Sequence, residues 1–421
     1  MSEISSEQES RRHPGLDGLR GIAILMVMLF HFTLMPPVAT WDKPLYTFAR
    51  YGWAGVDLFF VLSGFLITSI LLDAKGRKQY FKNFYARRML RVFPLYYAFV
   101  AGLLILYPLV GDPGWTREAE VLRDHWWWVW FHMTNWLVAR TGDFSTATLL
   151  GTGGFWSIAI EEQFYLVWPL FVLLLSERQL QWLCGAFFLL SLVTRLGMTA
   201  VGLSWTAVFT VTFGRMDSLA VGALIATVAR TPTGLNALRP FVLPIVVATV
   251  LPFVAIEVML RFIERPNYTL ALAVELSLIA ACSGALLVGT MTGNLDGIGA
   301  RFTHSTILRS FGKYSFALYL FHGHLNRWFE KFGFDVQGRS APSSAGSIMP
   351  RQLLYLFMAI GFSYLLAFLS WHLYEKHFLR LKTAFPSGRI PSVEDDSKAL
   401  STDCPESSGK GHPPSSDEPC A

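Results

Sequence analysis

The sequence predicts an all-α membrane protein, a polytopic helical bundle of about ten transmembrane helices. Of its 421 residues, 52% are hydrophobic and only 15% are charged. Together with a mean hydropathy of +0.40, this is more apolar surface than one water-soluble core can bury. Apolar runs of roughly 17 to 25 residues, long enough to cross a bilayer, recur along most of the chain.

Ten such runs follow one another, and each is predicted to form one spanning helix. Their approximate bounds are 18–37, 52–72, 91–110, 155–176, 180–202, 206–229, 238–260, 269–291, 312–330 and 351–375. Between the third and fourth runs, the segment WWWVWFHMTNWLV begins at Trp126. Because tryptophan rings favour the level of the lipid headgroups, this segment is predicted to be interfacial or re-entrant.

The basic residues set the orientation. The densest cluster lies between the second and third runs, and further basic residues precede the first run and follow the last. The positive-inside rule places these segments in the cytoplasm. We therefore expect a multi-pass protein of the inner or plasma membrane with a cytoplasmic tail at 1–15, a transmembrane domain at 16–380 and a disordered cytoplasmic tail at 381–421.

Composition also excludes several kinds of partner. The formal net charge is +5, but the basic residues do not form one solvated face, so no nucleic-acid partner is expected. The four cysteines show no CxxC or CxxH spacing, which argues against a disulfide framework or a zinc site. His322 and His324 are two residues apart and point to different faces of a helix, so no metal site is predicted.

The first run, LDGLRGIAILMVMLFHF, carries charges that are costly in lipid and therefore indicate a functional path. Arg20 and His31 are eleven residues apart, which is close to three helical turns, so they share one face about 16 Å apart along the axis. Asp17 lies on the same face and can pair with Arg20. The alternative is that Arg20 reaches to cytoplasmic headgroups and His31 caps the outer end of the span.

The next two runs add an acid and three arginines. GVDLFFVLSGFLIT places Asp57 near the outer end of the second run, and its small Ser63-Gly64 pair permits close helix packing. FYARRMLRVFPLYY places Arg87, Arg88 and Arg91 at the cytoplasmic entry to the third. These arginines are either topology anchors or a binding site for a phosphorylated cytosolic donor, which suits forked guanidinium groups.

Further charges lie inside later runs. FWSIAIEEQFYLVWPL sets Glu161 and Glu162 in an apolar helix, where adjacent carboxylates need a polar interior. The predicted topology places these two glutamates near His31 in the outer half, together with residues that we interpret as substrate-binding. That substrate-binding set is Asp57, Arg195, Arg215, Asp217 and His322. The alternative for Arg215 and Asp217 is a purely structural ion pair.

The predicted arginine cluster at the cytoplasmic end and His31 at the outer end together suit one chemistry in particular. An activated group is taken from an anionic cytosolic donor and delivered to an acceptor hydroxyl on the far side. Histidine is the side chain expected to remove the hydroxyl proton near neutral pH. A transporter or flippase with the same charges as a relay is the alternative, against which stands the lack of an internal repeat.

Six motifs in order resemble the acyltransferase-3 family of integral membrane, acyl-CoA-dependent O-acyltransferases. They are LDGLRGIAILMVMLFHF, GVDLFFVLSGFLIT, FYARRMLRVFPLYY, FWSIAIEEQFYLVWPL, GRMDSLAVGALIA and SFALYLFHGHL. The resemblance implies ten core spans and an activity that needs Arg20 and His31. It also matches the family's arginine motif to Arg88 and Arg91, with Arg87 beside them, and its Glu-Glu-Gln-Phe-Tyr motif to Glu161, Glu162 and Gln163.

The resemblance leads to a specific hypothesis. Acyl-CoA, most simply acetyl-CoA, binds Arg88 and Arg91 with its phosphates and extends past Arg20 to His31, which acts as general base or transient acyl carrier. Glu161 or Glu162 is expected to fix the tautomer of the imidazole. The acceptor is a carbohydrate, a lipid-linked glycan or another envelope or small-molecule hydroxyl, and the sequence selects neither it nor the acyl chain length. Some family members carry an extracytoplasmic esterase-like domain, which here would be a separate partner or unnecessary.

Overall fold

The computed structural model describes residues 14–110, 113–144, 154–264, 266–293, 298–334 and 347–386. All regular structure in these ranges is helical, which confirms the all-α prediction. Apart from residues 14, 15 and 381–386, the predicted tails at 1–15 and 381–421 lie outside the described residues.

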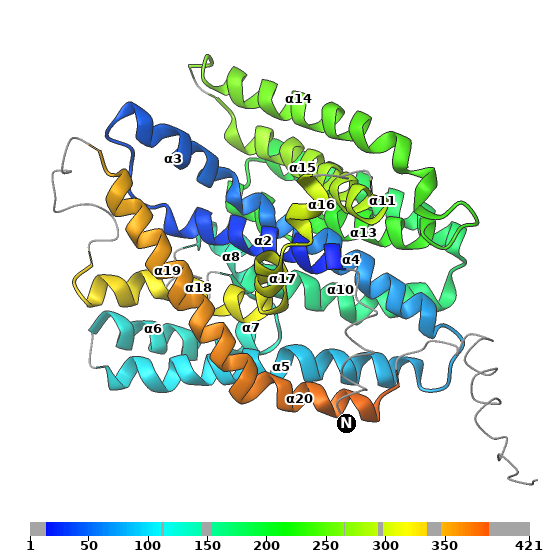
Figure 1. Cartoon of the computed structure of the whole chain (residues 1–421), viewed down its shortest axis with the longest axis horizontal. Helices are drawn as coiled ribbons and strands as arrows, with labels where there is room; N and C mark the ends of the chain where they lie inside the picture. The colour runs from blue at the N-terminus through cyan, green and yellow to red at the C-terminus, as the bar shows by residue number, and fades with distance from the viewer. Residues whose placement is uncertain are drawn as a thin grey trace, which may run out of the picture.

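Eight helical segments among the described residues are long and apolar enough to cross a membrane. They contain the α-helices α2 (Pro14–Phe32), α4 (Gly55–Ala74), α5 (Tyr80–Leu109), α10 (Phe155–Leu174), α11 (Glu177–Ala200), α14 (Val242–Leu260), α15 (Tyr268–Met291) and α19 (Met349–Ser370). The turn between α4 and α5 lies at the right of Figure 1, and the turn between α14 and α15 at the upper left. The eight segments coincide with eight of the ten predicted runs, so a multi-pass protein is confirmed.

The other two predicted spans are interrupted. The run at 206–229 forms α12 (Trp205–Thr210), the 3-10 turn η3 (Thr212–Arg215) and α13 (Met216–Val228), and the run at 312–330 lies in α17 (Thr306–Lys313) and α18 (Ser315–Lys331). Backbone that leaves a helix at membrane depth needs other hydrogen-bond partners. The carbonyl of Gly214 accepts one from the guanidinium of Arg195. The predicted ten spans are therefore approximate.

Shorter elements connect these helices. They are η1 (Thr40–Asp42), α3 (Lys43–Arg50), η2 (Tyr51–Ala54), α6 (Pro113–Asp124), α7 (Trp126–Trp130), α8 (Thr134–Thr141), η4 (Gly234–Ala237), η5 (Arg239–Phe241) and α16 (Ile298–Thr303). After α19 the chain continues through the π-helical turn η7 (Trp371–Glu375), α20 (Lys376–Arg380) and η8 (Leu381–Ala384).

The tryptophan-rich segment forms α7 and α8 and is tied to the bundle by Gln163 of α10. The side-chain amide of Gln163 donates to the carbonyl of His132 at 2.8 Å and to Oδ1 of Asn135 at 2.9 Å. Trp126 and Trp127 are exposed. The glutamine of the Glu-Glu-Gln motif thus anchors this segment, whose position at the headgroups stays a prediction.

Close glycine contacts bring the central helices together. α2 packs against α4, α17 and α18, and α4 packs against α13. A Cβ atom on Gly64 of α4 would collide with the carbonyl of Leu219 in α13, and one on Gly222 of α13 would collide with the carbonyl of Val61 in α4. The two backbones therefore meet at contact distance, as the Ser63-Gly64 pair predicts.

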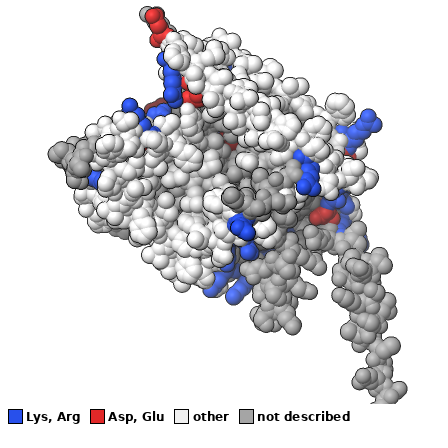
Figure 2. Space-filling view, turned by 45° about the horizontal axis from the view of Figure 1, so that its top comes forward, with Lys and Arg blue, Asp and Glu red and all other residues white. Residues whose placement is uncertain are grey.

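The outer surface is largely apolar. Most of the face in Figure 2 carries no charge, and Lys and Arg side chains are few on it. Of the eight spanning segments, the one that contains α14 is the least buried by the rest of the protein. Only 11% of its most apolar stretch is buried, compared with 61% for α15. A helix this apolar and this exposed is suited to lipid contact, so α14 lies at the periphery of the bundle.

Candidate active site

His31 lies next to the C-terminal end of α2, where its ring faces His322 of α18. Nδ1 of His31 is 2.9 Å from the carbonyl oxygen of Val27 and 3.3 Å from Nε2 of His322. The centroids of the two imidazole rings are 4.9 Å apart. The structure therefore brings together two histidines that are far apart in the sequence.

The hydrogen-bond pattern assigns the tautomer of both neutral rings. Nδ1 of His322 donates to the carbonyl of Leu318 at 3.1 Å, so Nε2 of His322 is an acceptor. Nδ1 of His31 faces two acceptors and therefore carries the ring proton. Nε2 of His31 consequently holds a lone pair, and no described residue forms a hydrogen bond with it.

Two amide side chains fix the end of α2 that carries His31. Nδ2 of Asn326 donates to the carbonyl of His31 at 2.9 Å, and Nε2 of Gln352 donates to the carbonyl of Phe32 at 2.9 Å. The last carbonyls of a helix have no partner within the helix. α18 and α19 supply these partners, so the backbone at His31 is held on both sides.

His31 and His322 line the main cavity, whose volume is about 560 Å³. This lies within the range of sites for small molecules, roughly 300–1,000 Å³. Its lining is mainly aromatic and apolar and includes Trp53, Phe155, Trp156, Trp205, Phe209, Tyr268 and Tyr319. Two carboxylates, Glu257 and Glu275, also line it.

A second polar group, the central charged cluster, consists of Arg20, Arg88, Glu161 and Glu162. The Arg88 guanidinium lies 3.8 Å from the ring centroid of Tyr165, and its Nε is 4.0 Å from the Glu162 carboxylate. Arg20 interacts electrostatically with Arg88 and Glu161. The Nε atoms of Arg20 and Arg88 are buried, and no described residue forms a hydrogen bond with either. Unmade buried hydrogen bonds are costly, so the cluster is suited to a ligand that accepts them.

The glutamates of this cluster do not contact His31, which corrects the expectation that one of them fixes its tautomer. Glu161 interacts with Arg88, Ser63 and Tyr165, while Val27 and His322 hold Nδ1 of His31. The reason is depth: α10 begins at Phe155, and Glu161 lies about two turns farther along the helix.

A small cavity lies between the cluster and the main cavity. Arg20, Ser63 and Glu161 line this second cavity, whose volume is about 60 Å³. Val56 and Tyr319 line both cavities. The hydroxyl of Tyr319 is hydrogen-bonded to Oγ of Ser157 at 2.6 Å, and its ring centroid is 5.6 Å from that of His322. The side chains of Val56 and Tyr319 therefore separate the cavity that Arg20 lines from the cavity that the histidines line.

Four of the five residues interpreted as substrate-binding form two fully buried ion pairs. Arg195 pairs with Asp217 at 2.8 Å, and Arg215 pairs with Asp57 at 2.9 Å. The suggested pair of Arg215 with Asp217 is wrong, because residues two apart at the start of a helix point to different sides. None of the four is among the residues that line the main cavity, whereas His322, the fifth, lines it.

The three arginines of α5 point to different surroundings. Arg88 belongs to the central charged cluster, and Arg91 interacts electrostatically with Glu375. Nη1 of Arg87 donates to the carbonyls of Lys382 and Phe385 at 3.1 and 2.8 Å. One arginine motif therefore serves three places in the structure.

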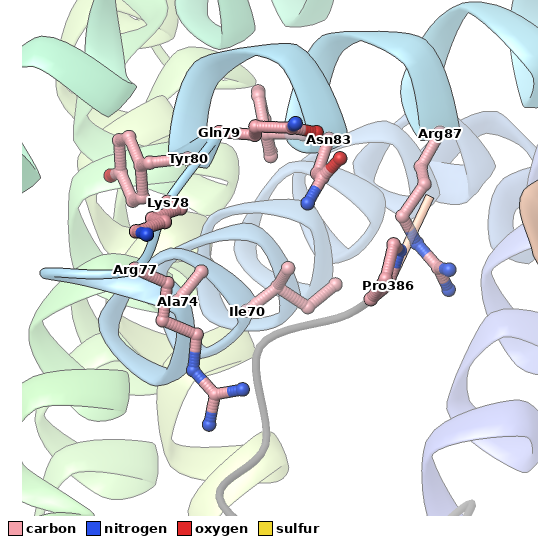
Figure 3. Close-up of a pocket in the computed structure, with 10 residues that line it drawn as sticks. Ile70, Ala74, Arg77, Lys78, Gln79, Tyr80, Asn83, Arg87 and Pro386 are labelled. Carbon is pink, nitrogen blue, oxygen red and sulfur yellow. The ribbon is translucent and has the colours of Figure 1, made fainter. Parts of the chain in front are cut away.

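Arg87 also lines a pocket of about 300 Å³ where α4 ends and α5 begins. We call it the basic pocket and define it by Arg77, Lys78, Asn83 and Arg87. Arg77 and Arg87 lie on opposite sides of it (Figure 3). Nη2 of Arg77 and Oδ1 of Asn83 are buried and have no hydrogen-bond partner in the described part of the chain. The pocket therefore offers a donor and an acceptor beside its cations.

Comparison with known protein families gives a decisive match. The family model of the acyltransferase domain, Acyl_transf_3, matches residues 13–369, which is most of the chain. The chain belongs to the acyltransferase-3 family. The predicted class of enzyme, an acyltransferase, is thereby confirmed. No group of three or more His, Cys, Asp or Glu side chains in the described part of this acyltransferase could hold a metal ion.

Curated relatives of this acyltransferase are O-acetyltransferases. Peptidoglycan O-acetyltransferase OatA of Listeria monocytogenes is 33% identical over 198 residues, which cover 45% of this chain and 28% of the relative. O-acetyltransferase OatA of Staphylococcus aureus is 32% identical over 168 residues, which cover 39% of this chain and 25% of the relative. The matched part thus spans between a quarter and a third of those relatives. No solved structure gives a significant match.

Sequence reasoning missed several residues of this acyltransferase that the structure places at the cavities. Tyr319 lies inside the SFALYLFHGHL motif and was not singled out there, and Val56 precedes Asp57 in the second motif. Glu257 and Glu275 were visible as charges at or within apolar runs, a signal of function. Without a fold, nothing in the sequence connected them to His31.

Proposed function

We propose that this protein is a membrane-bound O-acyltransferase that moves an acyl group, most simply acetyl, from cytosolic acyl-CoA to a hydroxyl of a cell-envelope carbohydrate. The observation that carries the proposal is the position of Nε2 of His31. Its lone pair has no hydrogen-bond partner among the described residues, and its ring lines a cavity of about 560 Å³. Family membership and the O-acetyltransferase relatives support the same reaction.

The donor enters at the basic pocket, which the proposal places on the cytoplasmic side with both termini. Phosphate oxygens accept hydrogen bonds from guanidinium groups more strongly than neutral acceptors do. Nη2 of Arg77 and the Nε atoms of Arg20 and Arg88 are buried donors without a hydrogen-bond partner. The nucleotide phosphates bind at Arg77 and Lys78, and the pantetheine arm continues past Arg88 and Arg20 into the small cavity.

The reaction takes place in the main cavity. Nε2 of His31 accepts the proton of the acceptor hydroxyl, and the hydroxyl oxygen attacks the thioester carbonyl carbon. The C–S bond breaks, and the CoA thiolate leaves with the proton that His31 holds. In the second version of the step, Nε2 attacks the thioester carbonyl carbon, the C–S bond breaks and CoA leaves as the thiolate. The acceptor hydroxyl then attacks the acyl carbon, the C–N bond to His31 breaks, and the hydroxyl proton passes to the CoA thiolate. Both versions use the lone pair that the tautomer leaves free.

The reaction is tested by expressing the protein in a host that lacks it. We expect an added acetyl mass on envelope glycans by mass spectrometry, and acetyl-CoA consumption by membranes that contain the protein. Accumulation of a substrate in vesicles without consumption of acetyl-CoA would instead indicate transport. A second arm with a co-expressed extracytoplasmic esterase-like protein tests whether transfer needs such a partner.

The basic pocket predicts a dependence on the 3′-phosphate of the donor. Replacing Arg77 by alanine removes one charge-assisted hydrogen bond, worth about 1.5–3 kcal/mol. We therefore expect the KM for acetyl-CoA to rise by roughly 10- to 100-fold. The KM for 3′-dephospho-acetyl-CoA, which lacks the group that Arg77 binds, should change little in the same variant.

Lys82 provides the control for Arg77. It is an exposed cation of the same α4–α5 region that does not line the basic pocket. Lys82→Ala should leave both KM values close to those of the wild type. An Arg77→Ala variant that raises both values equally would contradict a contact of this residue with the 3′-phosphate.

The histidine pair predicts an effect of His322 on the rate. Replacing His322 by alanine removes one of the two acceptors at Nδ1 of His31. A hydrogen bond contributes about 0.5–1.5 kcal/mol, so kcat should fall by roughly two- to tenfold. A glutamine at this position can still accept from Nδ1, so His322→Gln should recover part of the rate. Equal rates for the alanine variant and the wild type would remove His322 from the mechanism.

A further inference from the structure

The main cavity has an acidic wall that the reaction described above does not use. Glu257 lies in the last turn of α14 and Glu275 in the second turn of α15, and both line the cavity with His31. Glu275 is 5% exposed, and its Oε1 is buried and has no hydrogen-bond partner among the residues that the structure describes. We propose that Glu257 and Glu275 form the binding subsite for the acceptor and select a sugar ring that carries hydroxyls and no negative charge.

The proposal rests on the function proposed above and follows from the state of the two carboxylates. They repel each other electrostatically, and Tyr51 interacts with both of them, more strongly with Glu257. A buried acceptor oxygen without a donor costs about 1–3 kcal/mol. A ligand hydroxyl that donates to Glu275 removes this cost, whereas a carboxylate or phosphate on the ligand adds a third negative charge to the wall.

Aromatic side chains near the wall suit the faces of a sugar ring. Trp53 and Tyr268 line the main cavity and also a neighbouring pocket of about 380 Å³ that Glu257 shares with them. Aromatic faces cover the apolar CH face of a ring, while the polar groups hold its edge. Arg50 and Arg261 line the neighbouring pocket and do not line the main cavity, whereas Arg327 of α18 lines the main cavity on the side of the histidines. Acidic groups and aromatic rings therefore meet on the side of α14 and α15.

The volume limits what this subsite holds. At about 560 Å³ the cavity accommodates a small molecule or the end of a chain and not a long polymer segment. The hydroxyl to be acylated must reach Nε2 of His31, so the ring lies between the acidic wall and the histidine pair.

The test uses the full chain in lipid nanodiscs with acetyl-CoA and two matched probes, methyl β-glucoside and methyl β-glucuronide. Like charges brought together at a desolvated site cost several kcal/mol, so we expect the wild type to show a KM for the glucuronide at least about tenfold above that for the glucoside. Glu275→Gln removes the charge at constant size and should reduce this ratio severalfold. It should leave the KM for acetyl-CoA unchanged, and Glu257→Gln should act in the same direction.

Glu264→Gln is the matched control, because Glu264 is an exposed acid in the loop between α14 and α15 and does not line the main cavity. It should leave the ratio as in the wild type. A β-linked trisaccharide of the glucoside, compared with the monosaccharide, distinguishes a glycan chain end from a small glycoside as the source of the ring.

Three results would overturn the subsite. They are an unchanged ratio in both glutamine variants, an equal effect of the Glu264→Gln control, and release of CoA that depends on His31 without acetylation of any sugar probe. The last result leaves the proposed function standing and removes only the sugar subsite. Absence of any acetyl-CoA consumption would instead overturn the proposed function, and the subsite with it.

Discussion

Replacement of His31 by alanine is expected to lower kcat/KM for acyl transfer by roughly 10²- to 10⁴-fold, the range that a positioned general base contributes. Alanine has no lone pair in place of Nε2, and His31 lines the main cavity. His31 is also the only histidine in α2, so no neighbouring imidazole of this helix can replace it. The measurement is the release of CoA from acetyl-CoA together with acetate on the acceptor.

His372 is the matched control for this prediction. It lies in η7 and lines neither cavity, so His372→Ala should retain full activity. Both variants should show the thermal unfolding of the wild type in detergent, since the alanine at position 31 removes one ring at the edge of a cavity. Normal acetylation by the His31 variant would contradict the proposed mechanism.

A single-turnover experiment without acceptor separates the two versions of the step. If His31 carries the acyl group, intact-protein mass spectrometry should detect an added acetyl mass that disappears when acceptor is added. If His31 acts as general base, CoA release should require the acceptor. The same wild-type preparation gives both results.

The second large effect is on stability. Replacing Asp57 by alanine leaves the Arg215 guanidinium buried without its carboxylate, and breaking a buried pair in this way costs about 3–5 kcal/mol. Arg215 also packs on Phe60, Trp156 and Phe209, with its guanidinium carbon 5.0 Å from the ring centroid of Phe209. We therefore expect a lower unfolding temperature and a disturbed aromatic wall in the main cavity.

A double-mutant cycle checks the origin of this loss. The variant with both Asp57 and Arg215 replaced by leucine leaves no unpaired charge and should be more stable than either single variant. The unfolding of each detergent-solubilised variant can be measured by its intrinsic fluorescence. Single variants as stable as the wild type would show that the pair does not hold α4 to α13.

The spacing of Arg20 and His31 could be interpreted from the sequence because both lie in one uninterrupted helix. Within such a helix the geometry is fixed by 3.6 residues per turn, and α2 contains both residues. The partners of Asp57 could not be found in this way. Arg215 lies 158 positions away and reaches Asp57 because α4 and α13 meet at their glycines.

The relative depth of Glu161 and His31 along the membrane normal could not be predicted from the sequence either. Glu161 and His31 belong to different helices, and apolar runs do not fix the offset between two helices along the membrane normal. The structure places Glu161 with Arg20 and Arg88, one cavity away from the histidines. The tautomer of His31 likewise depends on His322, whose distance in sequence is 291 residues.

The position of Val56 and Tyr319 between the two cavities bears on proton leakage across a membrane that carries a transmembrane potential. Because the two cavities are separate volumes that meet at these side chains, they do not merge into an open pore. A thioester arm is slender enough to pass when side chains move, while a continuous column of water would conduct protons and dissipate the transmembrane potential. For the transfer proposed above, this partition means that an acyl group crosses the membrane without an open path for ions.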